Sequence, residues 1–270
     1  MAQTVGFLTD TTLCIGCKAC EVACKEWNGL PNNPLDFKGS YDNTGQLDHA
    51  NWRHVRFLET STSNPDKPIA WSMMSDVCKH CANASCLEVC PTNAIVRTEF
   101  DTVFIQQDVC NGCRDCIAAC PYGVIGFNQQ SGTAQKCTFC YDRLQNNLMP
   151  ACATACPTQS IKFGDLATMR QAAAERVQTL QSQGVSQAQV YGDTEYGGLH
   201  AMFILTDKPE AYGLPSQASA VLPGRNNIPG YLTAAVTAVL AGLAGLIAFR
   251  RRGEQPAAAT PPPAATTGGR

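Results

Sequence analysis

The sequence predicts an α+β fold in two cysteine-rich modules, one nested inside the other, followed by one C-terminal transmembrane helix. Two observations support this prediction. All 16 cysteines of the 270-residue chain fall into four quartets of related spacing. Near the C-terminus, Tyr231 to Phe249 is a run of 19 residues without a charge. We expect a cysteine-rich domain over residues 1–227, a membrane helix over 228–250 and a disordered, Pro/Ala-rich tail over 251–270.

The third quartet has the most regular spacing. Cys110, Cys113, Cys116 and Cys120 follow the pattern C-x2-C-x2-C-x3-C-P, which ends in Pro121. Bacterial ferredoxins use this run to hold 4Fe-4S clusters. Three thiolates on one tight loop bind one cluster, whereas the fourth lies on the following short helix and binds a second cluster. The proline then ends that helix.

The other three quartets repeat this pattern, one without change and two with insertions before the third cysteine. They are Cys14, Cys17, Cys20 and Cys24; Cys78, Cys81, Cys86 and Cys90; and Cys137, Cys140, Cys152 and Cys156. Every quartet ends in the same x3 step, and three of the four are followed by proline. A disulfide framework would suit an even cysteine count but would not explain this constant step. Structural zinc usually uses two C-x2-C pairs with a long spacer, which these quartets lack.

The position of the fourth cysteine predicts how the quartets pair. Quartets two and three are close in sequence, so we expect them to exchange their fourth cysteines, and quartets one and four to do the same around them. This gives four expected ligand sets: Cys14, Cys17, Cys20 and Cys156 (site A); Cys24, Cys137, Cys140 and Cys152 (site B); Cys78, Cys81, Cys86 and Cys120 (site C); and Cys90, Cys110, Cys113 and Cys116 (site D). The outer module then comprises residues 10–30 with 130–165 and the inner module residues 74–129, with an insertion over 28–70.

Seven polar or cationic residues lie inside or beside the quartets. We expect them to offset the negative charge of the clusters and to tune their potentials, although each could also be ordinary solvated surface. These candidates are Lys18, Lys25, Lys79, His80, Arg114, Lys136 and Arg143. Iron ligation by His80 is not required, because its quartet already supplies four thiols.

The rest of the sequence offers no second chemistry. It contains no catalytic triad, paired-carboxylate motif or Gly-rich phosphate loop, so we expect no catalytic residue and a chain that conducts electrons. Residues 1–229 carry 16 Lys and Arg against 21 Asp and Glu, a net charge of −5. Each all-thiolate cluster adds about −2 more. This acidic balance argues against a nucleic-acid partner, which requires a basic face.

Local patterns predict the elements around the quartets. A helix should begin after the N-cap Asp165 and end at Gly184, with one apolar face. Apolar runs separated by turn residues predict two hairpins and two further strands. The hairpins are expected over residues 94–106 and 122–134, and the strands over 52–59 and 199–205.

The apolar run Tyr231 to Phe249 has the length of a membrane span. As a helix it measures about 28 Å, close to the bilayer hydrocarbon core of about 30 Å, so we expect it to contact lipid. Arg250 to Arg252 follow directly, and the positive-inside rule places that flank in the cytoplasm. We therefore expect a single-pass cell-membrane protein with its cluster domain outside the cytoplasm. A cytoplasmic cluster domain is the alternative, because Met1 to Thr12 is not typical of a secretory signal.

Several segments resemble a known family, the four-cluster electron-transfer subunits of molybdopterin oxidoreductases. The similar stretches are Cys14 to Asn28, Trp52 to Phe57, Met74 to Cys81 and Lys136 to Arg143. Further details resemble one member of that group, the beta subunit of respiratory formate dehydrogenase. These details are Trp27-Asn28, Gly198 to His200, Tyr212 to Pro215 and the single C-terminal helix. The short N-terminus and the Pro/Ala tail depart from the pattern.

The resemblance implies an electron-transfer subunit that holds four 4Fe-4S clusters. In that family a large catalytic subunit with a molybdenum or tungsten bis-pterin cofactor oxidises formate, and that subunit carries a twin-arginine export signal. Electrons then cross the four clusters to a membrane cytochrome b subunit that reduces quinone. The equivalent subunit of a nitrate, polysulfide, tetrathionate or dimethyl sulfoxide reductase is an alternative function. A zinc-stapled membrane adaptor is a distant one.

Overall fold

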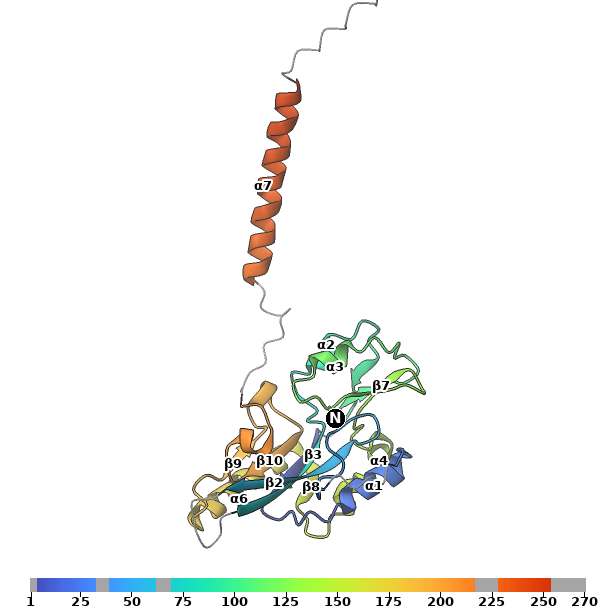
Figure 1. Cartoon of the computed structure of the whole chain (residues 1–270), viewed down its shortest axis with the longest axis vertical. Coiled ribbons are helices and arrows are strands. Elements are labelled where there is room, and N and C mark those ends of the chain that lie inside the picture. The colour runs from blue at the N-terminus through green and yellow to red at the C-terminus, as the bar shows by residue number, and fades with distance from the viewer. Residues whose placement is uncertain (1–3, 33–38, 62–68, 217–227, 254–270) are drawn as a thin grey trace, which may run out of the picture. The chain divides into compact units, whose positions relative to one another are not determined.

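The chain forms two compact units, residues 1–220 and 221–270, which are described separately. A computed structural model describes residues 4–32, 39–61, 69–216 and 228–253 (Figure 1). The first unit combines short helices with four small sheets, so the mixed helix and strand composition of the predicted fold is confirmed. Parts of the expected insertion, residues 33–38 and 62–68, lie outside the described residues.

A four-stranded sheet forms one side of the first unit, in the order β8 (Ile161–Asp165), β1 (Val5–Asp10), β10 (Ala201–Leu205) and β9 (Gln189–Tyr191). Strand β1 pairs in parallel with β10 and antiparallel with β8. The strand predicted near residue 199 is confirmed as β10, although it begins two residues later. Strands β1, β8 and β9 were not predicted, because each is short and lacks a clear alternating pattern.

Helix α6 (Leu166–Ser182) covers one face of this sheet. Its predicted N-cap is confirmed, because the Asp165 side chain accepts a hydrogen bond from the Thr168 N–H at 3.0 Å. Side chains alternate along β10, so Met202 and Ile204 pack against the helix. Phe203 lies on the opposite face, within the apolar cluster that surrounds the cysteine loops. The sheet therefore separates the helix from the cysteines.

Three antiparallel hairpins connect the cysteine loops. Two were predicted and are confirmed: β4 (Ile95–Arg97) with β5 (Val103–Ile105), and β6 (Gly126–Asn128) with β7 (Thr133–Gln135). The third joins β2 (Arg53–Ser61) to β3 (Ile69–Val77) and places Arg53 opposite Val77. Only its first strand was predicted.

Five short helices carry or adjoin the later cysteines of the quartets. They are α1 (Ala19–Asn28), α2 (Ser85–Glu88), α3 (Asp115–Ala119), α4 (Tyr141–Gln145) and α5 (Ala151–Thr154). Helix α1 contacts α5, and α2 lies beside α3 (Figure 1). These contacts bring the first quartet to the fourth and the second to the third. Two 3-10 helices, η1 (Glu195–Gly197) and η2 (Pro209–Tyr212), flank β10.

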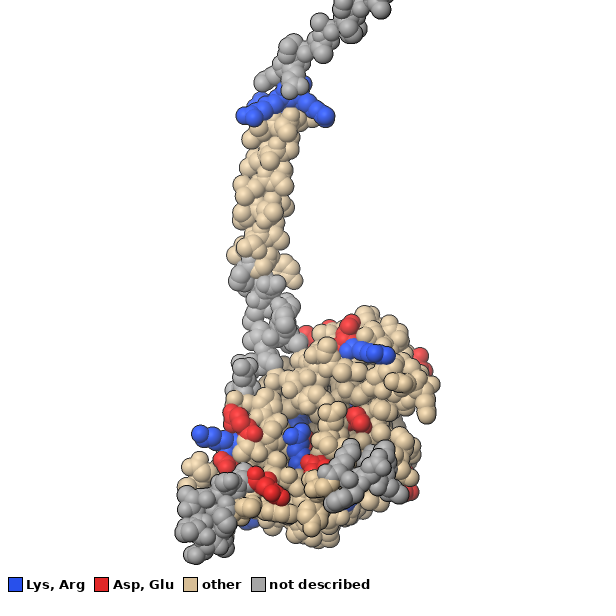
Figure 2. Space-filling view, viewed as in Figure 1, with Lys and Arg blue, Asp and Glu red and all other residues tan. Residues whose placement is uncertain are grey.

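The described part of the second unit, residues 228–253, is one helix, α7 (Ile228–Gly253). Residues Gly230–Arg252 include an 18-residue window with a mean hydropathy of 2.2 and are long and apolar enough to cross a membrane. The helix continues to Gly253, so it enters the first residues of the expected tail, whereas residues 254–270 lie outside the described residues. Arg250 to Arg252 occupy its last turn and form the blue group at one end of the helix in Figure 2.

Candidate cluster sites

The four cysteine loops share one backbone bend. In each quartet the residue before the second cysteine has a positive φ angle: 68° at Gly16, 45° at His80, 72° at Gly112 and 62° at Phe139. A left-handed residue at this point turns the backbone sharply between the first two cysteines. The shared bend indicates that the four loops hold their cysteines in the same way, despite the insertions that separate the later cysteines of two quartets.

The bend is occupied by glycine in two loops and by larger residues in the other two. A Cβ atom at Gly112 would lie 2.2 Å from the Gly132 carbonyl oxygen, so this loop has no room for a side chain. His80 and Phe139 adopt the same conformation and are fully buried, with ring centroids 4.7 Å apart in an edge contact. The His80 Nδ1 atom also accepts a hydrogen bond from the Val103 N–H at 3.1 Å. Tertiary contacts therefore hold these two residues in a strained conformation.

Site A is a cavity between the first loop and the end of the fourth quartet. Its lining includes the four cysteines Cys14, Cys17, Cys20 and Cys156. The Ser75 hydroxyl lies 3.2 Å from the Cys20 sulfur. Cys17 is exposed, whereas Cys20 is buried. Site A therefore has one edge at the surface of the first unit.

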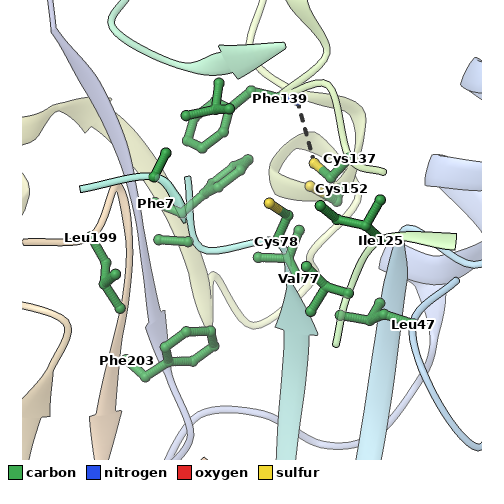
Figure 3. Packing of buried hydrophobic residues seen from close by; sticks show 14 of the residues in the cluster. Phe7, Leu47, Val77, Cys78, Ile125, Cys137, Phe139, Cys152, Leu199 and Phe203 are labelled. Carbon is green, nitrogen blue, oxygen red and sulfur yellow. Dashed lines mark hydrogen bonds between the residues drawn. The ribbon is translucent and has the colours of Figure 1, made fainter. Parts of the chain in front are cut away.

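Site B lies deeper in the same unit. Its cavity is lined by Cys24, Cys137, Cys140 and Cys152, all of which are buried. Figure 3 shows the sulfur atoms of Cys137 and Cys152 facing the same interior space, close to the sulfur of Cys78. The Cys137 sulfur accepts a hydrogen bond from the Phe139 N–H at 3.3 Å. Cys20 and Cys24, neighbours on α1, thus line different cavities.

Sites C and D are formed by the second and third loops. Cys78, Cys81, Cys86 and Cys120 line one cavity, together with His80 and Tyr122. In site D, Cys116 lies close enough to Cys90, Cys110 and Cys113 for their charges to interact. Cys113 is exposed, so site D also reaches the surface. Three cavities are thus lined by four cysteines each, and the remaining four cysteines lie near one another, whereas the role of these sets as cluster ligands stays a prediction.

The donor chemistry fits 4Fe-4S clusters. All 16 cysteines are free, so no disulfide competes for them. Among the residues that the structure describes, no three Cys, His, Asp or Glu side chains form a group that could hold a single metal ion. A zinc ion would need its four sulfurs at about 2.3 Å, whereas a cluster takes one thiolate at each of four separated iron atoms. Four cysteines around a shared cavity satisfy the second requirement.

Burial makes several of these thiols poor anions on their own, whereas at Cys90 burial is outweighed by hydrogen bonds from Ile95 and Thr92, which lower its pKa. Burial raises the pKa of Cys20 and of Cys86 to about 12, and the pKa of Cys116 to about 11. At neutral pH such thiols keep their protons unless a positive charge replaces them. Iron binding would supply that charge and release the protons. The sites therefore suit a cationic cofactor core and do not resemble reactive surface cysteines.

Six of the seven predicted tuning residues fall into three groups. Lys79 and Lys136 are buried, Lys79 in an ion pair with Asp76 and Lys136 with its ammonium group 3.1 Å from the Cys137 carbonyl oxygen. Besides Lys79, which lies 5.0 Å from two ring centroids, three of these cations lie over aromatic rings at 3.9 to 5.4 Å from the ring centroid: Lys18 over Phe57, Arg114 over Phe127 and Arg143 over Trp27. Lys25 donates to the carbonyl oxygens of Pro31 and Ala50.

His80 is the seventh candidate. Burial, together with the nearby charge of Lys136, holds the pKa of His80 well below its usual range. The imidazole is therefore neutral at physiological pH and adds no charge to site C. Its Nδ1 is held by the Val103 N–H, and the role of the ring in tuning a cluster stays a prediction.

Arg53 is the charged residue at these sites that the sequence did not identify. It begins β2, is 2% exposed and donates from Nη2 to the Cys152 sulfur at 3.1 Å. In the sequence, Arg53 was marked only by its place in a segment that alternates like a strand, and nothing there indicated a contact with a cysteine. Its contact with Cys152 spans 99 residues and depends on how the β2–β3 hairpin packs against the fourth loop. Asp76, which pairs with both Lys79 and Arg56, was also missed, because its pairing with Arg56 depends on the register of the β2–β3 hairpin.

Comparison with known proteins agrees with this geometry. Two models of a 4Fe-4S dicluster domain match residues 13–94 and 69–166, which together contain all four quartets. The fold and the cysteine sites thus define an iron–sulfur protein with 4Fe-4S dicluster domains.

Similarity to individual proteins identifies the family within this class. The chain is 40% identical over 217 residues to the formate dehydrogenase-O iron-sulfur subunit of Escherichia coli, covering 79% of this chain and 71% of the relative. It is 39% identical over 213 residues to the formate dehydrogenase iron-sulfur subunit of Haemophilus influenzae, covering 77% and 67%. It is also 34% identical over 173 residues to one subunit of the anaerobic dimethyl sulfoxide reductase of Escherichia coli, covering 63% and 78%. This protein belongs to the family of formate dehydrogenase iron-sulfur subunits, which confirms the resemblance seen in the sequence.

Proposed function

We propose that this subunit carries electrons through four 4Fe-4S clusters, from a molybdenum or tungsten bis-pterin catalytic subunit that oxidises formate to a membrane cytochrome b subunit that reduces quinone. The observation that carries the proposal is the convergence of 16 cysteines into four sets of four. A bound 4Fe-4S cluster accepts and returns one electron at a time. The subunit itself is proposed to be non-catalytic.

The proposed ligands are the cysteines of sites A to D, as defined above. Two nested ferredoxin-like modules follow, with sites A and B in the outer module and sites C and D in the inner one. The contacts of α1 with α5 and of α2 with α3 support this nesting, because each pair of helices joins two loops of one module.

We further propose that the sites are arranged in the linear order A, B, C, D. Three pairs of cysteines link successive sites, because the two members of each pair are close enough for their thiolate charges to interact. The pairs are Cys20 with Cys152, Cys137 with Cys78, and Cys86 with Cys116. The two cysteines classed as exposed, Cys17 and Cys113, belong to the first and last sites of this order. The surfaces beside these two cysteines are therefore the proposed points at which electrons enter and leave the subunit.

Helix α7 is proposed to cross the bilayer once and to fix the subunit beside its membrane partner. Its length and hydropathy support this assignment. The arginines of its last turn favour a cytoplasmic C-terminus and a cluster domain on the opposite side of the membrane. Export of the folded subunit would then depend on a signal carried by the catalytic partner.

A second candidate is electron transfer in the reverse direction, to the catalytic subunit of a reductase. The 34% identity to a subunit of the anaerobic dimethyl sulfoxide reductase favours this alternative over other classes, and nitrate, polysulfide or tetrathionate reductases belong to the same type. The cysteine geometry does not favour a zinc-stapled adaptor.

The test is purification of the intact complex from the membranes of its native host, followed by iron and acid-labile sulfide analysis. We expect at least about 16 acid-labile sulfide ions per complex, four for each of four clusters, which the haem of a cytochrome b does not supply, and bleaching of the visible absorbance when formate is added. Full clusters that bleach only with a reductant from the quinone side would favour the reductase alternative. A folded subunit without iron would refute both.

A further inference from the structure

Arg53 is a buried cation without an acidic partner. Its side chain is almost completely enclosed, and none of the ion pairs found among the described residues includes it. The neighbouring Arg56 on the same strand, by contrast, pairs with Asp76 at 3.0 Å. A buried guanidinium is costly unless an anion offsets its charge. Arg53 therefore requires an anion other than a carboxylate.

The contacts of Arg53 identify where that anion lies. Its Nη2 donates to the Cys152 sulfur in site B at 3.1 Å, and its Nη1 donates to the Ser75 carbonyl oxygen at 3.1 Å. The Ser75 hydroxyl in turn lies 3.2 Å from the Cys20 sulfur in site A. The charge of Arg53 interacts with both Cys152 and Cys20. The guanidinium thus lies between sites A and B.

One donor of this guanidinium has no protein partner. The Nε–H of Arg53 is buried and makes no hydrogen bond. Arg53 also lines the cavity of site B together with the four cysteines of that site. The Phe7 ring, 5.0 Å from the guanidinium carbon, covers another side of the group. A buried donor without a partner in a cavity built for a cofactor indicates a bond to that cofactor.

We propose that Arg53 is the shared counter-ion of the clusters in sites A and B, and that its free Nε–H donates a hydrogen bond to a sulfur of the cluster in site B. This inference rests on the proposed function, because it assumes that both sites hold 4Fe-4S clusters. A fixed positive charge and an N–H···S bond both stabilise the more negative, reduced state of a cluster. Arg53 therefore raises the reduction potentials of clusters A and B, whereas clusters C and D lie beyond its contacts.

The test is a redox titration of the purified complex, followed by electron paramagnetic resonance, after iron and acid-labile sulfide have been measured. In Arg53→Gln, which removes the charge, we expect the equilibrium constant for reduction of two clusters to fall about tenfold. This lowers the reduction potential of each by about 59 mV, because each is a one-electron couple. The other two clusters should keep their potentials. Unchanged potentials in a fully loaded Arg53→Gln complex would overturn the counter-ion role.

A second variant separates the charge from the hydrogen bond and remains informative if Arg53→Gln does not fold. Arg53→Lys keeps the charge but has no Nε–H, so we expect the potential of one cluster, that of site B, to fall by more than that of site A. A cluster B potential equal to that of the unmodified complex would overturn the hydrogen bond. Arg170→Gln is the control, because Arg170 is a half-buried arginine that pairs with Asp193 and lines none of the three cysteine cavities described for sites A, B and C.

The measurements also separate this inference from the function on which it rests. If the unmodified complex contains no iron, both the function and the role of Arg53 are refuted. If it contains four clusters that formate reduces, and the Arg53 variants leave all potentials unchanged, only the role of Arg53 is refuted.

Discussion

Replacing Gly112 with alanine should prevent the third loop from closing around site D. Gly112 has a φ angle of +72°, where an alanine costs about 1–2 kcal/mol. Its Cβ would lie 2.2 Å from the Gly132 carbonyl oxygen, so the β6–β7 turn would have to move. Overpacking of this kind adds about 1–3 kcal/mol.

Gly123 is a matched control for this change. It follows the same quartet, its φ angle is +60°, and a Cβ at this position would meet nothing within 4 Å. Gly123→Ala therefore carries the conformational cost without the clash. For a domain of this size each kcal/mol lowers the unfolding temperature by about 2–4 °C, so Gly112→Ala should unfold about 2–12 °C below Gly123→Ala.

The assay is thermal unfolding of the intact complex, with iron content measured in parallel. We expect Gly112→Ala to lose iron equivalent to one cluster, whereas Gly123→Ala retains all of it. Equal unfolding temperatures and equal iron contents would show that the β6–β7 turn does not restrict the loop, and would refute the reasoning.

Three further predictions concern other parts of the protein. Cys116→Ala should remove the cluster of site D and interrupt electron flow to quinone, while formate oxidation with artificial acceptors continues; undiminished quinone reduction would contradict the proposed path. Asp76→Asn leaves Lys79 buried without its carboxylate and should destabilise the first unit by about 3–5 kcal/mol in thermal or denaturant unfolding. Burial alone would raise the pKa of Asp76, but Lys79 and Arg56 hold it below its usual range. The stabilisation from this ionised carboxylate is present above its unfolded pKa of about 3.9, so the difference should stay constant between about pH 6 and pH 8; a difference that shrinks toward pH 6 would contradict it. Leu240→Arg places a charge at the middle of α7 and should cost about 3 kcal/mol of membrane insertion, so less subunit should sediment with membranes than for the control Leu240→Ala; equal sedimentation would argue against a span.

The candidate sites could be proposed from the sequence because the patterns that mark them are local. The constant x3 step and the following proline specify a loop and a short helix, and the fourth-cysteine rule then specifies which quartets must meet. The hairpins at 94–106 and 122–134 contain residues that are typical of turns, and Asp165 is a residue type that is typical of an N-cap. Strands β1, β8 and β9 are defined instead by partners distant in sequence, and nothing in their own residues distinguishes them.

The bends at His80 and Phe139 also could not be predicted, because they too depend on partners distant in sequence. Gly16 and Gly112 mark the left-handed position in two loops, but a histidine and a phenylalanine occupy it in the other two. Their conformation depends on an edge contact between the two rings and on the Val103 N–H. These partners are brought together only by the packing of the second loop against the fourth.

The sequence by itself determined the class of cofactor, the number of cysteines for each site and the presence of a helix long enough to cross a membrane. These properties follow from spacing and hydropathy, which act over a few residues or along a single helix. Only the tertiary structure decided which cysteines reach the surface and how Arg53 is buried beside the cysteines of two different cavities. The physical reason is that a charge acts through space, so the β2–β3 hairpin must fold against a loop 99 residues away before Arg53 can meet Cys152.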